Sequence, residues 1–429
     1  TVGGNYLSSD ASNATAFQII VSDKDLSKIK GKRDKAIKRG LLVNEPDSYV
    51  PIQLVTDGDT LLGEMRLKGH MLDHLEGDKW SYRIKLSGDD RFQGMKRFSI
   101  QHPGTRNYAY EWLFHEMLKR EDIIALNYDF AKVKLNDQEL GLYAIEEHFA
   151  EELLEHNERP KGAILRFNPN LYWERRERME IKGERLYEQY SRYRSGFLEP
   201  YDQGTVFKDS SLYQNFLEAE NKLEKFRVGK LTASEIFDVK KLATYHAILD
   251  LVGGHHSLDW SDVKYYLNPE TDLIEPVGYE SFSVRESYHI CGNQRYIEGE
   301  DKFKFLHTTM FSDPEFFKAY IQELERIAQR SYVDELMEAV ATDLNEVQTV
   351  LHSEFPHKEV SPDGYYRNQD LILSQLDLPK GFHGYYSSKT GKKLYLQLGA
   401  INHLPIHITG IEIDGKYQEI KPIILPSKR

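Results

Sequence analysis

Cysteine is nearly absent from the 429 residues of this chain, since Cys291 is the only one. A single thiol cannot form a disulfide within the chain, so the fold must be held by buried apolar side chains rather than by cross-links. At this length the chain can build two or three domains with large cores. The lone cysteine does not decide the cellular compartment, because many exported bacterial proteins have no disulfides.

An excess of positive charge and a long apolar run are also missing. The formal net charge is -12 at pH 7, which argues against a general nucleic-acid binder because phosphate contacts need a basic surface. No apolar run approaches the length of a membrane span. Charged residues make up 29% and aromatic residues 12% of the chain. This balance is typical of a globular protein and excludes a disordered acidic tail.

An initiator methionine is absent from the start, which reads Thr1-Val2-Gly3. We therefore expect a trimmed N-terminus. The compartment stays open, and an exported or cell-envelope-associated bacterial protein whose signal or anchor has been removed is favoured.

After a polar leader at residues 1–15, the spacing of apolar residues along the chain changes twice, which divides it into three segments. Residues 16–146 show mostly alternating patterns, which predict an antiparallel sheet with one or two helices. Residues 147–379 show apolar residues at three- and four-residue spacing, which predicts helices with two short strands among them. Residues 380–429 alternate again, so we expect a small antiparallel β appendage at the C-terminal end.

Three polar clusters of unlike chemistry end strand-like segments in the first half of the chain. They read MRLKGH (65–70), GDKWSYRIKL (77–86) and LGLYAIEEHF (140–149). In the second cluster, alternation places Ser81, Arg83 and Lys85 on one strand face, and a row of cations there suits an anion such as a nucleotide phosphate. The third cluster brings Glu146 and Glu147 to the exit of a hairpin strand.

These clusters, together with FSIQHPGTRNY at residues 98–108, resemble the N-terminal lobe of the spore-coat CotH kinase family, a divergent branch of the protein-kinase-like fold. The resemblance extends roughly from Phe17 to Phe282. It implies an α+β, two-lobed, atypical protein-kinase-like fold, with residues 16–146 as the small lobe and residues 147–379 as the large lobe. It also implies ATP as phosphate donor, with Mg²⁺ or Mn²⁺ as the cofactor ion.

The resemblance assigns nucleotide-binding roles to six residues of the first half. Arg66 and Lys68 precede Gly69, at a turn where the backbone could approach a phosphate. Two lysines occupy the positions of the family's strand lysines, one glutamate lies a turn inside the helix that Arg106-Asn107 opens, and another follows the hairpin. The inner glutamate would pair with one of the strand lysines. These four residues are Lys79, Lys85, Glu111 and Glu147.

The segment GGHHSLDWSDVKYYLNPETDLIEPVGYESFS, residues 253–283, resembles the family's catalytic loop and metal strand. By this resemblance Asp259 would position or deprotonate the acceptor hydroxyl. Asp262 stands at the family's asparagine position and Glu280 at its second aspartate position, so these two carboxylates would hold the metal ion.

Two functions of different class remain open. One is an atypical CotH-like kinase that transfers phosphate from ATP to a protein, polysaccharide or other envelope-associated acceptor. The other is a catalytically weak, pseudokinase-like protein that binds a nucleotide, a glycan or a protein partner, or has a structural role in the cell envelope or spore coat. Neither reading includes a nucleic-acid partner.

Two further groups of residues give weaker indications of a functional site. His246, His255 and His256 suggest a transition-metal site, but no HExxH motif or cysteine pair accompanies them, and we expect His256 to orient the loop that carries Asp259. Cys291 has His289 nearby, but the segment contains no acid to orient the histidine, as an activated thiolate would need.

Overall fold

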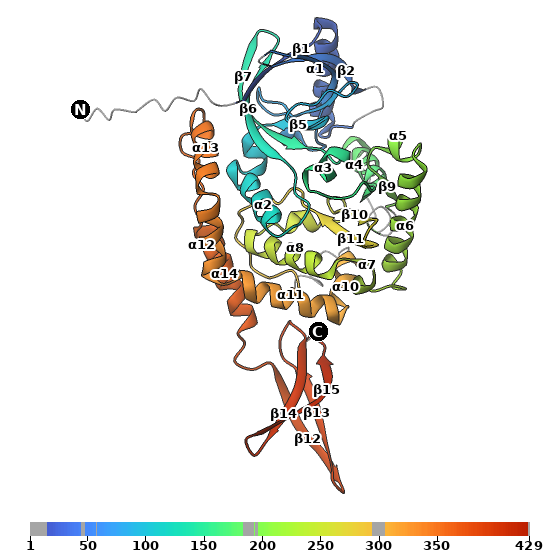
Figure 1. The fold of residues 1–429 in the computed structure, drawn as a ribbon, viewed down its shortest axis with the longest axis vertical. Helices are drawn as coiled ribbons and strands as arrows, with labels where there is room; N and C mark the ends of the chain where they lie inside the picture. The colour runs from blue at the N-terminus through green and yellow to red at the C-terminus, as the bar shows by residue number, and fades with distance from the viewer. Residues whose placement is uncertain are drawn as a thin grey trace, which may run out of the picture.

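The computed structural model describes residues 15–43, 48–56, 58–182, 193, 196–293 and 305–427. The chain forms a β-barrel at one end, a mostly helical body in the middle and two long β-hairpins that project from the opposite end (Figure 1). The cavity that contains the candidate site lies where the barrel meets the body.

A closed barrel of seven strands forms the N-terminal part of the chain. In order around the barrel the strands are β1 (Thr15–Ile20), β2 (Val50–Val55), β3 (Thr60–Leu67), β4 (Tyr82–Leu86), β5 (Arg97–Gln101), β7 (Gln138–Glu147) and β6 (Tyr128–Leu135). Neighbours are antiparallel except β1 and β6, whose parallel ladder closes the barrel with Phe17 opposite Val133. Buried apolar side chains such as Ile19, Met65 and Phe98 pack together in its core.

The closed barrel contradicts the fold class predicted from the sequence. A two-lobed kinase-like fold would have an open small-lobe sheet, whereas this sheet closes on itself through β1 and β6. The two-lobed prediction is therefore wrong. Alternation identifies strands and their buried faces, but it contains no information on which distant strand becomes the neighbour. The domain boundaries drawn from the sequence stay predictions.

Two helices of the N-terminal part pack against the barrel. Helix α1 (Asp23–Arg39) covers its outside; it begins where the Ser22 hydroxyl accepts a hydrogen bond from the Asp25 amide at 3.2 Å and ends at Gly40, whose φ is 78°. These are ordinary N-cap and C-cap signals. Helix α2 (Ala109–Arg120) follows the 3₁₀ turn η4 (Pro103–Arg106) and is buried along most of its length between barrel and body.

The body is built around one buried helix and a small sheet. The antiparallel sheet has the order β11 (Leu273–Val277), β10 (Lys264–Asn268), β8 (Ile164–Phe167), β9 (Leu198–Pro200). Helix α8 (Val239–Val252) is buried on all sides from Leu242 onward and packs against α11 (Pro314–Ile327). It ends at Gly253, with φ of 64°, where a Cβ atom would overlap the backbone of Arg285.

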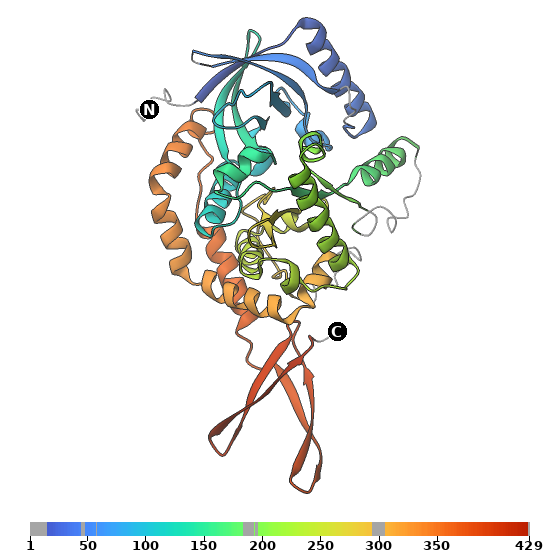
Figure 2. The same cartoon turned by 45° about the vertical axis from the view of Figure 1, so that its right-hand side comes forward.

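The other helices surround this centre. They are η3 (Leu72–His74), α3 (Glu151–His156), α4 (Asn170–Lys182), α5 (Gln203–Val206), α6 (Ser210–Arg227), α7 (Ala233–Ile236), η6 (His255–Leu258), α10 (Phe305–Phe311), α12 (Arg330–Ala339), α13 (Ala341–His352) and α14 (Asp363–Leu376). Helix α13 returns to the barrel and contacts α2 and β6 (Figure 2). Of the helices described, none has the length and apolar character needed to cross a bilayer.

The chain ends in two antiparallel hairpins, in the segment where the sequence predicts strands. The first joins β12 (Phe382–Thr390) to β13 (Lys393–Ala400), and the second joins β14 (Ile406–Ile413) to β15 (Lys416–Leu425). They are separate two-stranded sheets, and each ends in its own turn, away from the other (Figures 1 and 2).

The barrel core yields a direct stability test on the closing strand. Ile19 is fully buried in the barrel, whereas its neighbour Ile20 is 39% exposed. We expect Ile19→Ala to lower the free energy of unfolding by about 2–5 kcal/mol, because it removes packed methylene groups and leaves a cavity. The matched variant Ile20→Ala should cost under about 1 kcal/mol. Urea denaturation of both variants measures the difference, and equal losses would mean that β1 does not close the barrel in solution.

Candidate functional site

A cavity of about 690 Å³ lies between the barrel, helix α4 and the sheet of the body. Cations line it from the barrel and the sheet, and carboxylates line it from the loops around η3, η6 and the end of β11. The cations are Arg66, Lys68, Arg83, Arg106, Arg166, Arg176 and Lys264, and the carboxylates are Asp73, Asp259, Asp262 and Glu280. Another cavity of about 660 Å³, between β6, α2 and α13, contains none of the residues predicted from the sequence.

The turn after β3 forms one wall of the cavity. Its Gly69 has φ of 91°, and a Cβ atom there would overlap the ring of His74, so only glycine fits without rearrangement. The next residue, His70, stacks on Trp173 of α4, with ring centroids 4.5 Å apart and planes 11° from parallel. This stack connects the barrel turn to the helix across the cavity, and burial lowers the pKa of His70 to about 4, so the ring is neutral at pH 7.

A buried charge network joins the barrel to the loop that carries Glu280. The Lys68 ammonium donates to Gln101 Oε1 at 2.9 Å and to Glu146. Arg106 Nε lies 3.8 Å from Glu146 Oε2, while Arg106 Nη2 donates to Glu280. Burial lowers the pKa of Lys68 to about 8, although Glu146 opposes the shift. Burial raises the pKa of Glu146, but the attraction of Lys68 and Arg106 outweighs it, so this carboxylate stays ionised.

Arg83 is the least satisfied charge in the cavity. Its side chain is only 8% exposed, yet within the described part of the chain its Nε and Nη1 atoms have no hydrogen-bond partner. It stands directly opposite Arg66 in the β3–β4 ladder, and like charges in facing positions repel. A buried guanidinium with unmade hydrogen bonds is costly unless an anion accepts from it. The geometry around Arg83 therefore fits an anionic ligand.

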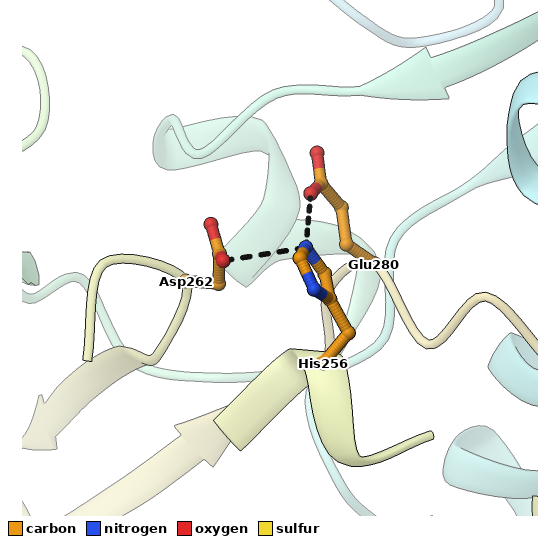
Figure 3. A group of neighbouring side chains, drawn as sticks. All are labelled: His256, Asp262 and Glu280. Carbon is orange, nitrogen blue, oxygen red and sulfur yellow. Dashed lines mark ion pairs between the residues drawn. The ribbon is translucent and has the colours of Figure 1, made fainter. Parts of the chain in front are cut away.

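Three side chains of the cavity form a group with the geometry of a metal site (Figure 3). The His256 Nε2 atom lies 3.4 Å from Asp262 Oδ2 and 3.6 Å from Glu280 Oε2, and one ligand atom from each residue lies within 4.8 Å of the others. Figure 3 shows the imidazole nitrogen pointing between the two carboxylates. Glu280 holds φ at 49°, a conformation that costs free energy in residues other than glycine and is typical of functional sites.

The protonation states of this trio follow from burial and mutual charge. Burial and the neighbouring Glu280 raise the pKa of Asp262 to about 7. Burial also opposes ionisation of Glu280, but Arg106 outweighs it and holds the pKa of Glu280 well below its usual range. Burial lowers the pKa of His256. The hydrogen bond to Glu280 and the negative charge of Asp262 have the opposite and larger effect, so the pKa of His256 is raised overall. The interactions that favour a proton on His256 would also stabilise a divalent cation at this point, and the imidazole would release that proton on becoming a ligand.

Five of the residues predicted from the sequence line this one cavity: Arg66, Lys68, Asp259, Asp262 and Glu280. Asp259 is exposed, and its Oδ1 atom accepts hydrogen bonds from the Ser261 amide at 3.1 Å and the Ser261 hydroxyl at 2.9 Å. These contacts orient the carboxylate without burying it, so it remains accessible from the cavity.

The two strand lysines lie outside the cavity. Lys79 donates to the Leu142 carbonyl at 2.8 Å and forms an ion pair with Glu354 at 2.6 Å. Lys85 pairs with Glu64 on the neighbouring strand at 3.3 Å. Both lysines therefore serve as ion-pair partners within this fold, and Arg83, which lies on β4 with Lys85, lines the cavity instead.

The remaining two predicted residues also lie outside the cavity lining. Glu111 forms no ion pair with Lys79 or Lys85; it accepts hydrogen bonds from the Ser281 amide at 3.0 Å, the Ser281 hydroxyl at 2.8 Å and the Phe282 amide at 3.1 Å. It thereby holds the loop directly after Glu280. Glu147 accepts from the Asn127 amide at 2.9 Å and pairs with His156 at 2.8 Å, which fixes the end of β7.

Sequence reasoning missed several residues that complete the site. Glu146, and not Glu111, is the carboxylate that pairs with a buried lysine, and that lysine is Lys68. The sequence does indicate that Glu146 or Glu147 has a special position, since both end the hairpin strand. Only the pairing of β7 with β5 shows which of the two reaches Lys68. Arg166 and Lys264 meet in the β8–β10 ladder, and nothing local in the sequence indicates this contact.

Comparisons with known proteins do not assign a function to the site. The chain matches no protein-family model and no curated protein. Membership of the CotH kinase family therefore stays a prediction drawn from the residues quoted above.

Because Arg83 has hydrogen-bond donors without partners, replacing it should weaken anion binding without lowering stability. We expect Arg83→Leu to weaken binding of inorganic tripolyphosphate by about 1.5–3 kcal/mol, the usual contribution of a hydrogen bond to a charged group. The melting temperature should stay constant or rise, because the variant removes a buried charge with unmade hydrogen bonds. Isothermal titration calorimetry and thermal unfolding give the two values, with Arg91→Leu, an exposed arginine outside the cavity, as control. Unchanged affinity would mean that the anion binds elsewhere.

The raised pKa of Glu111 should make the stability of the folded chain depend on pH. Burial raises its pKa from 4.5 to about 7 in the folded chain, so between these values the folded state holds a proton that the unfolded state has released. The free energy of unfolding contributed by this group is therefore largest below about pH 4.5 and falls as the pH rises towards 7. We expect Glu111→Gln to lack this contribution, so that its stability relative to the wild type increases from pH 5 to pH 7.5 in urea titrations. A constant difference would contradict the raised pKa.

Proposed function

We propose that this chain is a metal-dependent phosphotransferase that binds a nucleoside triphosphate such as ATP and transfers its terminal phosphoryl group to a hydroxyl group of a protein or envelope-associated acceptor. The observation that carries the proposal is the presence, in one cavity, of a set of cations and the trio His256, Asp262 and Glu280. Phosphoryl transfer needs both features together, since its catalysis is mainly positioning and charge stabilisation.

The cation side of the cavity supports the donor. A triphosphate carries several negative charges in a chain of oxygen atoms, and Arg66, Arg83 and Lys68 approach the cavity from adjacent barrel strands. The volume of about 690 Å³ falls within the usual range of small-molecule sites. The stacked pair of His70 and Trp173 on the wall provides an aromatic surface beside these charges, and such surfaces stack on planar bases.

The acidic side of the cavity fits a divalent cation. His256, Asp262 and Glu280 would hold it, since carboxylate oxygens suit Mg²⁺ and Mn²⁺ and an added imidazole favours the transition-metal ion of the two. When bound, such an ion neutralises charge on the phosphate oxygens and orients them. The residues of the chain contribute the rest: they place the phosphates, exclude water from the buried side and hold Glu280 against Arg106.

The transfer step balances with Asp259 as the proton acceptor. The acceptor hydroxyl oxygen forms a bond to the terminal phosphorus, the bond from that phosphorus to the bridging oxygen breaks, and a nucleoside diphosphate leaves. The hydroxyl proton passes to the Asp259 carboxylate, which is exposed at the cavity and oriented by Ser261. A positioned base of this kind contributes about 10²–10⁴-fold to a rate.

A catalytically weak nucleotide-binding protein is the second candidate, and a specific contact favours it. Glu280 already has Arg106 as an ion-pair partner, and burial with the charge of Glu280 raises the pKa of Asp262 to about 7, so both carboxylates are less available to a metal ion than free ones. In this reading the cavity binds the nucleotide and no turnover follows.

Two aspartate variants distinguish catalysis from binding. With γ-labelled ATP and Mn²⁺, we expect Asp259→Asn to lower phosphate transfer, including autophosphorylation, by about 10²–10⁴-fold, with ATP affinity within a few-fold of the wild type. Asp262→Asn should weaken the Mn²⁺-dependent rise in melting temperature that ATP produces, because a ligand that binds only the folded state stabilises it.

The matched control is Asp137→Asn, at an exposed aspartate in the turn between β6 and β7. This variant should change neither phosphate transfer nor the rise in melting temperature. Equal labelling of Asp259→Asn and the wild type would remove Asp259 from the mechanism. ATP binding without transfer to any acceptor tried would favour the second candidate, and the absence of any ATP-dependent thermal shift would overturn both.

A further inference from the structure

The two C-terminal hairpins expose large apolar side chains along their length. In the first hairpin Tyr386 is 67% exposed and its cross-strand neighbour Leu396 is 52% exposed. In the second hairpin the exposed apolar residues include Ile411, Ile413, Tyr417, Ile423 and Ile424. An isolated two-stranded hairpin is marginally stable in water, because its strands need a third strand or a packed face. A surface that covers these apolar side chains would therefore stabilise the hairpins.

The hairpins do not supply this surface to each other within one chain. They are separate sheets with no ladder between them, although β13 touches β15, and Leu404, in the segment that joins the hairpins, is buried. Beyond the base the two turns lie apart in both views (Figures 1 and 2). Most side chains along both hairpins are consequently exposed.

The two hairpin tips have opposite charge. The first hairpin, residues 382–400, has three lysines at its tip and no carboxylate anywhere; they are Lys389, Lys392 and Lys393. The second hairpin, residues 406–425, has three carboxylates, Glu412, Asp414 and Glu419, and two lysines, of which Lys416 lies at the tip and Lys421 further along β15. All of these side chains are exposed, and among the described residues no ion pair joins the lysines of the first tip to the carboxylates of the second.

We propose that the hairpins form the interface of a symmetric dimer, in which the first hairpin of one copy packs along the second hairpin of another copy. A two-fold axis makes this contact occur twice, because each chain offers one hairpin of each kind. The apolar faces cover each other, and the lysines at one tip meet the carboxylates at the other. Opposite charge fixes the pairing, since two first hairpins would bring six lysines together.

Charge reversal tests the pairing. Variant A carries Lys389→Glu, Lys392→Glu and Lys393→Glu, so that both of its hairpin tips are acidic. Variant B carries Glu412→Lys, Asp414→Lys and Glu419→Lys, so that both tips are basic. Each variant alone should dimerise about tenfold more weakly than the wild type at 0.1 M salt or below, because like charges then face each other. Sedimentation velocity over a concentration series measures the dissociation constants.

Mixing the two variants gives the decisive outcome. An acidic pair of tips matches a basic pair at both contacts of the two-fold interface, so A and B together should form a heterodimer under conditions where neither forms a homodimer. Distinct fluorescent labels on A and B make this heterodimer visible in the same sedimentation experiment. A mixture that stays monomeric, or a wild type that is monomeric up to about 100 μM, a concentration at which interfaces of standard size are occupied, would overturn the proposal.

Two controls separate the interface from general effects. Lys24→Glu, Lys30→Glu and Lys35→Glu on α1 reverse the same number of exposed lysines far from the hairpins, and this variant should dimerise as the wild type does. The apolar face is tested by Tyr386→Ser with Leu396→Ser, which should also weaken the dimer about tenfold, whereas Tyr288→Ser, 73% exposed on the body, should not. Open-ended aggregates in place of a dimer would contradict the two-fold contact.

Discussion

The buried chain of charges from Lys68 through Glu146 and Arg106 to Glu280 is the interaction on which the candidate site depends. It connects β3 and β7 of the barrel to η4 and then to the loop after β11. Removing one member would leave a buried charge without its partner, which is more costly than never having buried the pair. The network therefore fixes how the barrel and the body meet, and the cavity lies along that junction.

The cavity gathers like charges that the fold itself does not neutralise. Arg83 faces Arg66 across one ladder, and Lys264 faces Arg166 across another. Some of these cations have protein partners, such as Glu199 for Arg166, but the guanidinium of Arg83 keeps unmade hydrogen bonds. Native folds accept such strain mainly where a ligand relieves it. The trio His256, Asp262 and Glu280 places metal-type ligands next to these anion-type donors in one cavity. The proposed phosphoryl transfer rests on this adjacency.

The hairpins depend on a different physical constraint. They project from the body with exposed apolar faces and carry opposite charges at their tips. The barrel and the body bury their own cores, whereas the hairpins bury little within one chain. Association with another copy would give these strands the packed face that two strands alone lack, and it would leave the cavity, at the far side of the body, uncovered.

The sequence by itself determined the local structure and the kinds of residue at the site. Alternation in 16–146, helical spacing in 147–379 and the Gly69 turn are local properties that short segments reveal. The resemblance of short motifs to the CotH kinase family pointed to Arg66, Lys68, Asp259, Asp262 and Glu280, which one cavity brings together. The tertiary structure decided the long-range pairings. The parallel contact of β1 with β6 closes the barrel and rules out the two-lobed fold, and the β5–β7 and β8–β10 ladders select Glu146, Arg166 and Lys264. Which distant strand lies alongside another depends on packing of the whole core, and local periodicity contains no record of it.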